Sequence, residues 1–367
     1  AWMHMVIRVD TTQVSANDRV RLYINGVDER TLGGYSADTI PAQDSTDIVF
    51  FEDTADQYIG TYYSGTNPYD GYLAAVIYCD GQSYAPTEFG EFDTDSPTIW
   101  KPKTPSGLTF GDNGFYLDFE DSANLGADVS GNGNDFTETN LTASDQATDT
   151  PSNNFCTMNF LQNRSLLVYA EGNNEIVGYG DGYSRAGYGT MALSAGKWYY
   201  EFKVNSTVPG NTIMGIANVN GINAQSSLRF NPFGSGTGYT YGYKHVDGNK
   251  VTSGTASSYG NTYTQNDIMS CAFDLENLKI YFAKNGTWQD SGDPTSGATG
   301  TGSAFDLQSG ENYMPAQQFD NGPTIQYNFG GCSAFDVASA NQDGNGYGNF
   351  EYAVPSGYLA MCTKNLG

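Results

Sequence analysis

The sequence is poor in positive charge and almost free of histidine. Its 367 residues include 16 Lys and Arg against 41 Asp and Glu, a formal net charge of −25, and only 2 histidines. Nucleic acids and anionic membrane surfaces bind basic proteins, so both are excluded as partners. His4 and His245 lie far apart in the sequence, which excludes a His-based catalytic triad and a His-rich metal site. The acidity favours either solubility or carboxylates gathered around Ca²⁺.

Cysteine, long apolar runs and catalytic motifs are also scarce. The 5 cysteines are widely spaced without a CxxC pattern, which argues against a zinc site or a disulfide framework. No apolar run approaches the roughly 18 residues of a membrane-spanning helix, and no GxSxG, HExxH or P-loop pattern occurs. Glu91, Asp93 and Asp95 alternate as glycosidase carboxylates do, but turn residues surround them. We therefore expect neither membrane insertion nor enzymatic activity.

The sequence is rich instead in glycine, with 45 residues, and in tyrosine, with 27. With few Lys, Glu and Leu, this composition is typical of an all-β protein with many turns. Residues 2–9 and 19–27 alternate apolar and polar side chains, and an Asn-Gly pair, a strong hairpin signal, lies in the second run. Further strands are expected at 47–51 and 71–79. Because the chain opens within a strand pattern, we expect its true N-terminus to lie upstream.

The strand patterns divide the chain into four parts. Residues 1–98 predict most of a β-sandwich, and residues 99–160 are a Gly/Asn/Asp-rich connector with one short strand candidate at 114–119. Residues 161–335 carry dense strand candidates between turn clusters, the pattern of a second sandwich. Residues 336–367 form a C-terminal extension. The predicted fold class is therefore all-β, with two antiparallel β-sandwiches joined by the connector.

One stretch, “DIMSCAFDLENLKIYFAKNGTW” at 267–288, predicts a meander of two strands and two tight turns. “DLEN” supplies the first turn and Asn285-Gly286 the second. The apolar residues of the two strands share one face: Met269, Cys271, Phe273, Leu278, Ile280 and Phe282. This pattern builds a core and contains no catalytic geometry.

The same stretch resembles the central signature of SPRY domains, in which a strand ending in Phe-Asp is followed by “KIYF-KNG”. “GKWYYEFKV” at 196–204 resembles an early strand of that family, and “YMPAQQFDNGPTIQYNFG” at 313–330 resembles its closing strands. The three motifs occur in the family's order between residues 196 and 330. The resemblance implies a SPRY sandwich whose recognition surface lies on loops at one end.

Two further resemblances concern the rest of the chain. The run from “WMHMVIRVD” to “GYLAAVIYC” is similar to the later strands of a laminin-G or concanavalin-like lectin domain. “FGEFDTDSPTIWKPK”, “DTPSNNFCTMN” and the terminal “VPSGYLAMCTKNL” resemble a module of structural proteins of marine tailed bacteriophages, where it joins a lectin-like to a SPRY-like domain.

These resemblances imply a non-enzymatic virion structural protein, a tail fibre or external appendage that contributes to recognition of a host-surface glycan or protein. Such a protein would assemble in the host cytoplasm as a homo-oligomer with other virion proteins. Two alternatives remain open. The chain could be a purely architectural capsid-decoration or fibre protein without a host ligand, or a bacterial secreted adhesin with an extracellular location.

Tyrosines placed between glycines are the candidate ligand-binding groups. Tyr in Gly/Ser-rich loops provides contact area at low entropic cost, and its ring stacks on sugars. With the loop ends that the SPRY resemblance implies, the candidates are Arg185, Tyr188, Tyr239, Tyr241, Tyr243, His245 and Trp288. The alternative is that these tyrosines pack subunit contacts.

One oxygen-rich loop, “DVSGNGND” at 128–135, is a candidate calcium site. Oxygen-bearing side chains at alternate positions with glycines between them can wrap a Ca²⁺ ion. The candidate ligands are Asp128, Ser130, Asn132, Asn134 and Asp135. The alternative, an ordinary Asn-Gly-rich turn, also applies to the similar loop at 341–351.

Overall fold

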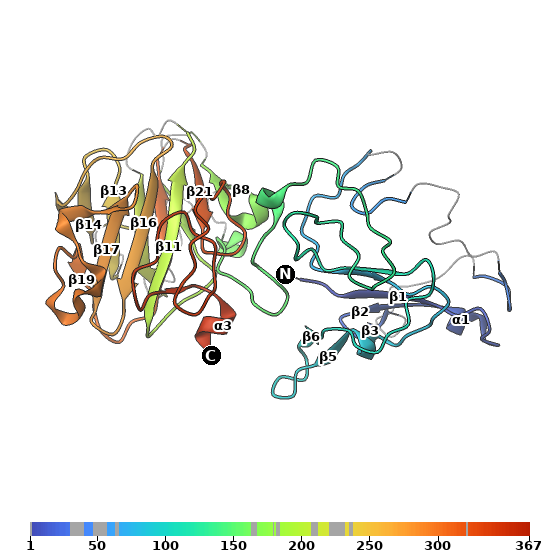
Figure 1. Cartoon of the computed structure of the whole chain (residues 1–367). Helices are drawn as coiled ribbons and strands as arrows, with labels where there is room; N and C mark the ends of the chain where they lie inside the picture. Colours follow the sequence, from blue (N-terminus) through green and yellow to red (C-terminus); the bar gives the residue numbers. More distant parts are fainter. Residues whose placement is uncertain are drawn as a thin grey trace. The chain divides into compact units, whose positions relative to one another are not determined.

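The computed structural model of the chain contains two compact units (Figure 1). The first comprises residues 1–146 with 150–152, and the second 147–149 with 153–367. The strand expected at 47–51 lies outside the described residues, and the four-part division expected from the sequence stays a prediction. The structure describes residues 2–29, 40–46, 57–62, 66–162, 167–178, 180, 184–206, 212–219, 232–234, 238–320 and 322–367.

The N-terminal hairpin expected from the alternation is present, but Met5 and Ile7 on the apolar face of β1 are 51% and 59% exposed, so this face is open to solvent. β1 (Met5–Val9) pairs antiparallel with β2 (Val20–Ile24), and β2 pairs antiparallel with β3 (Val27–Asp28). The short helix α1 (Ala16–Arg19) precedes β2. Asn25 and Gly26 turn the chain with φ of 48° and 77°, as a type I′ turn requires. Gly26 has a second reason to be glycine, because a Cβ there would lie 2.2 Å from the Trp100 ring.

Two smaller sheets complete the described part of the first unit. β4 (Val76–Tyr78) pairs with β7 (Phe115–Leu117), and β5 (Gly90–Phe92) pairs with β6 (Trp100–Pro102). The strand expected at 71–79 is therefore shorter than its apolar run, whereas the one expected at 114–119 is confirmed as β7. Because β7 pairs with β4, connector residues are part of the first unit.

The second unit has a six-stranded antiparallel sheet on one side. Its strands follow the spatial order β10 (Arg185–Tyr188), β20 (Tyr313–Phe319), β12 (Ile213–Asn218), β13 (Thr240–Lys244), β14 (Asn249–Thr252) and β15 (Thr255–Ser258). The strand order is far from the sequence order, so the sheet depends on contacts between distant parts of the chain.

The opposing sheet has nine strands. Along the main path they are β18 (Thr287–Trp288), β17 (Lys279–Lys284), β16 (Ile268–Asp274), β11 (Lys197–Val204), β21 (Thr324–Asn328), β9 (Glu175–Val177) and β8 (Val168–Ala170). β19 (Phe305–Asp306) adds to β17, and β22 (Leu359–Ala360) runs parallel to β11. The expected meander at 267–288 is confirmed as β16, β17 and β18.

The core of the second unit lies between these two sheets. Met214 and Tyr243 reach it from the six-stranded sheet, and Phe202, Phe273 and Phe282 from the nine-stranded sheet; none of the five side chains is accessible to solvent. The Tyr243 and Phe282 rings stack across the interface with centroids 5.4 Å apart. This arrangement confirms the predicted sandwich. Aromatic and β-branched residues favour strands, so the composition of these segments agrees with it.

A third layer covers the outer face of the nine-stranded sheet. Tyr199 and Tyr281 on that face pack against Phe350 and Tyr358 of the C-terminal segment, which ends in α3 (Thr363–Leu366). Figure 1 shows this segment, drawn in red, crossing strands β11 and β21. The C-terminal extension is thus an integral part of the second unit.

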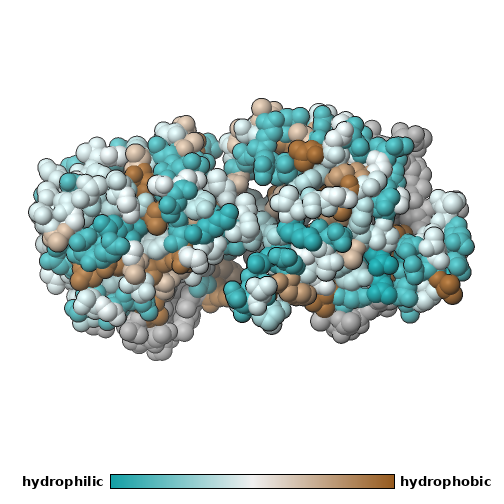
Figure 2. All heavy atoms as spheres, turned by 60° about the horizontal axis from the view of Figure 1, so that its bottom comes forward, coloured by the Kyte–Doolittle hydropathy of each residue, from teal (hydrophilic) through white to brown (hydrophobic). Residues whose placement is uncertain are grey.

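The surface is mainly polar, as the composition implies. Figure 2 shows hydrophilic residues over most of the face drawn, with small separate hydrophobic patches. In the part of the chain that the structure describes, no helix has the length and hydropathy of a membrane span. The side chains of Cys156, Cys271, Cys332 and Cys362 are buried, and that of Cys79 is half-buried.

Phe282→Ala should lower the free energy of unfolding by about 3–5 kcal/mol, because it removes a ring packed between both sheets. Phe160→Ala, at a side chain that is 56% exposed in the same unit, is the matched control and should cost less than about 1 kcal/mol. Guanidinium unfolding of the full chain measures both. Equal losses for the two variants would contradict the assignment of the core.

Candidate functional site

Three of the four tyrosines predicted to bind a ligand, Tyr188, Tyr241 and Tyr243, lie in strands, not in loops. Tyr241 and Tyr243 belong to β13 and point into the sandwich, because they alternate with Thr240 and Gly242. The Tyr243 hydroxyl donates to the Asn261 carbonyl, and burial raises its pKa well above the usual range. The prediction that Tyr241 and Tyr243 lie in a binding loop was therefore wrong, and their rings are core residues.

The strand register also separates the remaining candidates. Arg185, at the start of β10, and His245, just after β13, share one end of the six-stranded sheet but lie on strands three places apart, about 14 Å at normal strand spacing. Tyr188 ends the edge strand β10 and is buried in a cluster separate from the core between the sheets. Trp288 lies in the opposing sheet, against the cluster around Tyr281. The structure therefore does not gather the predicted binding residues into one site.

Tyr239 alone among these candidates is well exposed, at 42% of its side-chain area. Its backbone is held rigidly by Asn218 at the end of β12. The Tyr239 N–H donates to Asn218 Oδ1 at 3.2 Å, and the Asn218 N–H donates to the Tyr239 carbonyl at 2.9 Å. Asn218 Nδ2 also donates to Glu311 Oε2 at 2.9 Å. An exposed aromatic ring and a half-buried carboxylate are thus fixed by one buried amide.

We call Tyr239, Asn218 and Glu311 the Tyr239 surface. It combines an aromatic face with a negative charge, which suits a cationic side chain: the ring attracts the cation and the carboxylate pairs with it. The sequence signal for Tyr239 was a tyrosine beside glycine, whereas Glu311 carried no signal. Only the pairing of β12 with β13 and β20 brings the two together.

The candidate calcium loop is closed by its own hydrogen bonds. Asp128 Oδ1 accepts from the N–H groups of Tyr116 and Ser130, and Oδ2 accepts from Ser130 Oγ and the Asn134 N–H, at 2.8–2.9 Å. Burial raises the pKa of Asp128, but these donors more than offset it, so the net pKa lies below the ordinary value. With every lone pair of the carboxylate occupied, no oxygen is left for a cation.

The other predicted ligands agree with this conclusion. Asp135 accepts the Asp128 N–H, and the amides of Asn132 and Asn134 donate to backbone carbonyls, among them that of Gly114. Among the described residues no group of three or more His, Cys, Asp or Glu is placed to hold a metal ion. The residues predicted for calcium do not fit the ion and instead organise a turn beside β7.

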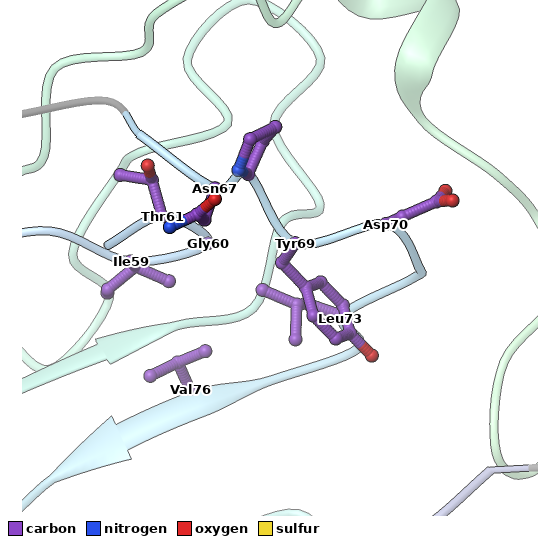
Figure 3. Close-up of a pocket in the computed structure, with 9 residues that line it drawn as sticks. Ile59, Gly60, Thr61, Asn67, Tyr69, Asp70, Leu73 and Val76 are labelled. Atoms are coloured by element: carbon purple, nitrogen blue, oxygen red, sulfur yellow. The ribbon is translucent and has the colours of Figure 1, made fainter.

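An open pocket lies in the tyrosine-rich segment of the first unit, with a volume of about 570 Å³ (Figure 3). Leu73 and Val76 contribute apolar side chains, and the Tyr69 ring, 57% exposed, stands beside Leu73. Its lining residues are Ile59, Gly60, Thr61, Asn67, Pro68, Tyr69, Asp70, Leu73 and Val76. The pocket is a shallow apolar surface without a buried polar group directed into it.

A carboxyl group that sequence reasoning missed lies on the outer face of the nine-stranded sheet. Glu201, in the middle of β11, is inaccessible to solvent. Burial raises its pKa to about 7, although four hydrogen-bond donors oppose the shift. The sequence gives no signal for it, because a lone Glu in a strand normally faces water.

Comparison with known proteins agrees with the second unit's sandwich. Residues 197–331 match the SPRY domain family. A Ran-binding proteins 9/10 homolog of Drosophila melanogaster is 34% identical over 94 residues, which are 25% of this chain and 9% of the relative. Ran-binding protein 9 of Danio rerio is 32% identical over 97 residues, 26% of this chain and 15% of the relative. The chain therefore spans less than a sixth of these relatives.

The crystal structure of the SPRY domain of human HERC1 aligns with 46% of this chain and 92% of its own length, at 19% identity and a TM-score of 0.33.

These relatives overturn the function expected from the sequence. The expectation of a phage tail fibre or appendage depended on linker resemblance, but the curated relatives are Ran-binding proteins of animals. The virion assignment was wrong, and so were its architectural and adhesin alternatives. The physical reason is that the linker motifs form local structure that any fold can use: “FGEFDTDSPTIWKPK” contains the β5–β6 hairpin, and “VPSGYLAMCTKNL” contains β22 and α3. The virion or extracellular location stays a prediction.

Asp128→Asn should lower the stability of the full chain by about 1.5–3 kcal/mol, because it weakens charge-assisted hydrogen bonds to backbone N–H groups. Asp70→Asn, at an exposed residue of the same unit, is the control and should be nearly neutral. Calorimetry measures both, with and without EDTA, and chelation should change neither the native protein nor the variants. A native melting temperature that falls with EDTA would contradict the closed turn.

The family match and the topology describe the same residues. The matched range 197–331 begins at β11 and ends just after β21, and it includes the meander whose signature resembles the family's. Both sheets of the sandwich contribute strands to it. The second unit of this chain therefore contains a SPRY domain.

Proposed function

We propose that the chain is a non-enzymatic interaction protein whose SPRY domain binds a basic segment of a partner protein at the Tyr239 surface. The relatives that share this domain are named for binding Ran, which makes protein partners the natural class for this chain as well. The identity of the partner is not carried over, since the match covers a small part of those proteins.

The observation that carries the proposal is the rigid exposure of Tyr239 beside Glu311. An aromatic ring on a fixed backbone loses little conformational entropy on binding, which is why Tyr is frequent among interface hot spots. The net charge of −25 attracts basic partners and increases their rate of association. A segment bearing Arg or Lys fits both the ring and the carboxylate.

A non-enzymatic role agrees with the contacts and burial of both histidines. His4 Nδ1 accepts the Trp100 indole N–H at 3.0 Å, and burial lowers the pKa of His4. His245 is 7% exposed, with its ring against Tyr263. Each histidine ring packs against an aromatic side chain, His4 on Trp100 and His245 on Tyr263. The alternating carboxylates at 91–95 also agree with a structural role. Asp93 Oδ1 accepts hydrogen bonds from the backbone N–H groups of Asp95 and Ser96 and so closes a turn.

The first unit adds no separate activity to this proposal. Its laminin-G-like character stays a prediction, as does assembly of the chain into homo-oligomers.

A random peptide library displayed against the full chain tests the proposal. We expect enrichment of peptides with Arg or Lys, and at least a tenfold loss of their affinity in Tyr239→Ala, in line with hot-spot tyrosines. Glu311→Gln should cause a smaller loss and a weaker salt dependence.

Tyr62→Ala is the matched control, because Tyr62 is a 70% exposed tyrosine of the first unit. It should leave peptide binding unchanged. Failure to enrich any peptide, or equal losses in Tyr62→Ala and Tyr239→Ala, would contradict the proposal.

A further inference from the structure

Residues 341–362 cross the outer face of the nine-stranded sheet, and we call them the strap. Their apolar anchors are Phe350 and Tyr358, neither accessible to solvent. The Phe350 ring meets Tyr199 edge to face with centroids 5.1 Å apart, and the Tyr358 hydroxyl donates to the Pro294 carbonyl at 3.0 Å. At its C-terminal end, β22 pairs with Trp198 and Tyr199 of β11, so the strap completes the sheet there.

One carboxyl group, that of Glu201, makes two polar contacts between sheet and strap, and Asn328 Nδ2 of β21 makes another to the Asn349 carbonyl at 2.8 Å. Glu201 Oε1 accepts the Tyr352 N–H at 2.8 Å, and Oε2 accepts the Glu351 N–H at 2.9 Å. Two further donors come from the sheet: the Tyr199 hydroxyl at 2.9 Å and Asn328 Nδ2 at 3.2 Å. Two successive backbone amides of the strap therefore depend on a side chain that has no access to water.

Among the residues that the structure describes, no cation is in hydrogen-bond or ion-pair contact with Glu201. On β11, Lys203 lies over the Phe335 ring, and Lys197 pairs with Asp274 of β16. β21 contributes the neutral Asn328. The strap contributes Tyr352 and Glu351, whose own carboxylate accepts from the Ala338 N–H. An ionised Glu201 is thus stabilised by dipoles alone, while burial penalises its charge.

Both protonation states fit the same hydrogen-bond geometry. Tyr199 Oη lies 2.9 Å from Glu201 Oε1 and 2.9 Å from Ser270 Oγ. When Glu201 is protonated, its hydroxyl can donate to Tyr199, and Tyr199 then donates to Ser270. The two strap amides keep their acceptors. The neutral form therefore retains the contacts without the cost of a buried charge.

We propose that the strap is a pH-dependent latch, closed on the nine-stranded sheet in acid and released as the pH rises through neutrality. Release uncovers the aromatic face formed by Tyr199 and Tyr281, together with the β11 edge that β22 occupies. The sign follows from burial: a carboxyl whose pKa is higher in the closed state than in water stabilises closure at low pH. That contribution falls as pH rises from about 4.5 to about 7.

Hydrogen exchange of the full chain, followed by mass spectrometry from pH 5.5 to pH 8.5, tests the latch. After correction for intrinsic exchange rates, protection of peptides covering residues 345–362 should fall by an order of magnitude or more across this range. Peptides from β16 should keep their protection, because the sandwich core remains folded. A parallel loss in β16 would indicate global unfolding and would overturn the proposal.

Two variants separate the latch from general weakening of the strap. Glu201→Gln places an amide NH₂ against one strap N–H, so strap protection should be low and independent of pH. Asp343→Asn weakens a different anchor, the carboxylate that accepts the Ala360 N–H at 2.8 Å. It should lower protection while keeping the pH profile.

Glu276→Gln, at an exposed residue of the same unit, is the matched control and should behave as the native chain. Strap protection that does not change with pH in the native chain, or a pH profile that survives in Glu201→Gln, would overturn the latch.

Discussion

The burial of both faces of β11 is the constraint on which the second unit depends. All five residues from Trp198 to Phe202 are buried, so the strand has no side that faces water. An antiparallel sheet normally needs cover on one face only. Here Trp198, Tyr200 and Phe202 require the six-stranded sheet, while Tyr199 and Glu201 require a layer from elsewhere in the chain. The three-layered architecture follows from this alternation.

The abundance of tyrosine follows from the same architecture. A buried Tyr supplies a large apolar ring but needs a partner for its hydroxyl. The Tyr200 hydroxyl donates to the Gly215 carbonyl at 2.8 Å across the sandwich, and the Tyr263 hydroxyl to the Tyr243 carbonyl at 2.9 Å. Each bond joins strands or loops that are distant in sequence. These two hydroxyl groups thus help to fix the alignment of the elements that they join.

The sequence predicts local elements well where the signal is short in range. Both Asn-Gly turns and the β16–β17 meander were expected and are present, because turn chemistry and alternation act between neighbours. The tyrosines of β13 were misplaced because their glycines looked like loop residues. In the structure a Cβ at Gly215 would lie 2.0 Å from the Tyr241 carbonyl oxygen, and one at Gly242 would lie 2.8 Å from the Phe233 ring. Close approach, which needs knowledge of the neighbouring strand, explains those glycines.

The site was less predictable than the fold for the same reason. Nothing near Glu311 in the sequence connects it to Tyr239, and nothing near Glu201 connects it to residues 351–352. Oxygen-rich loops were visible at once, but whether such oxygens face a cation or their own backbone is decided by the turn they adopt. At Asp128 the N–H groups of the turn itself fill the acceptor positions.

The pairing of β22 with β11 has a consequence for the order in which the chain folds. The two strands are about 160 residues apart, and a chain leaves the ribosome from its N-terminal end at a finite speed. While residues 205–358 are being made, the β11 edge at Trp198 and Tyr199 has no strand beside it. An unpaired edge of this kind is a site for pairing with other chains. The nascent second unit therefore keeps this edge open until residues 359–360 have been made.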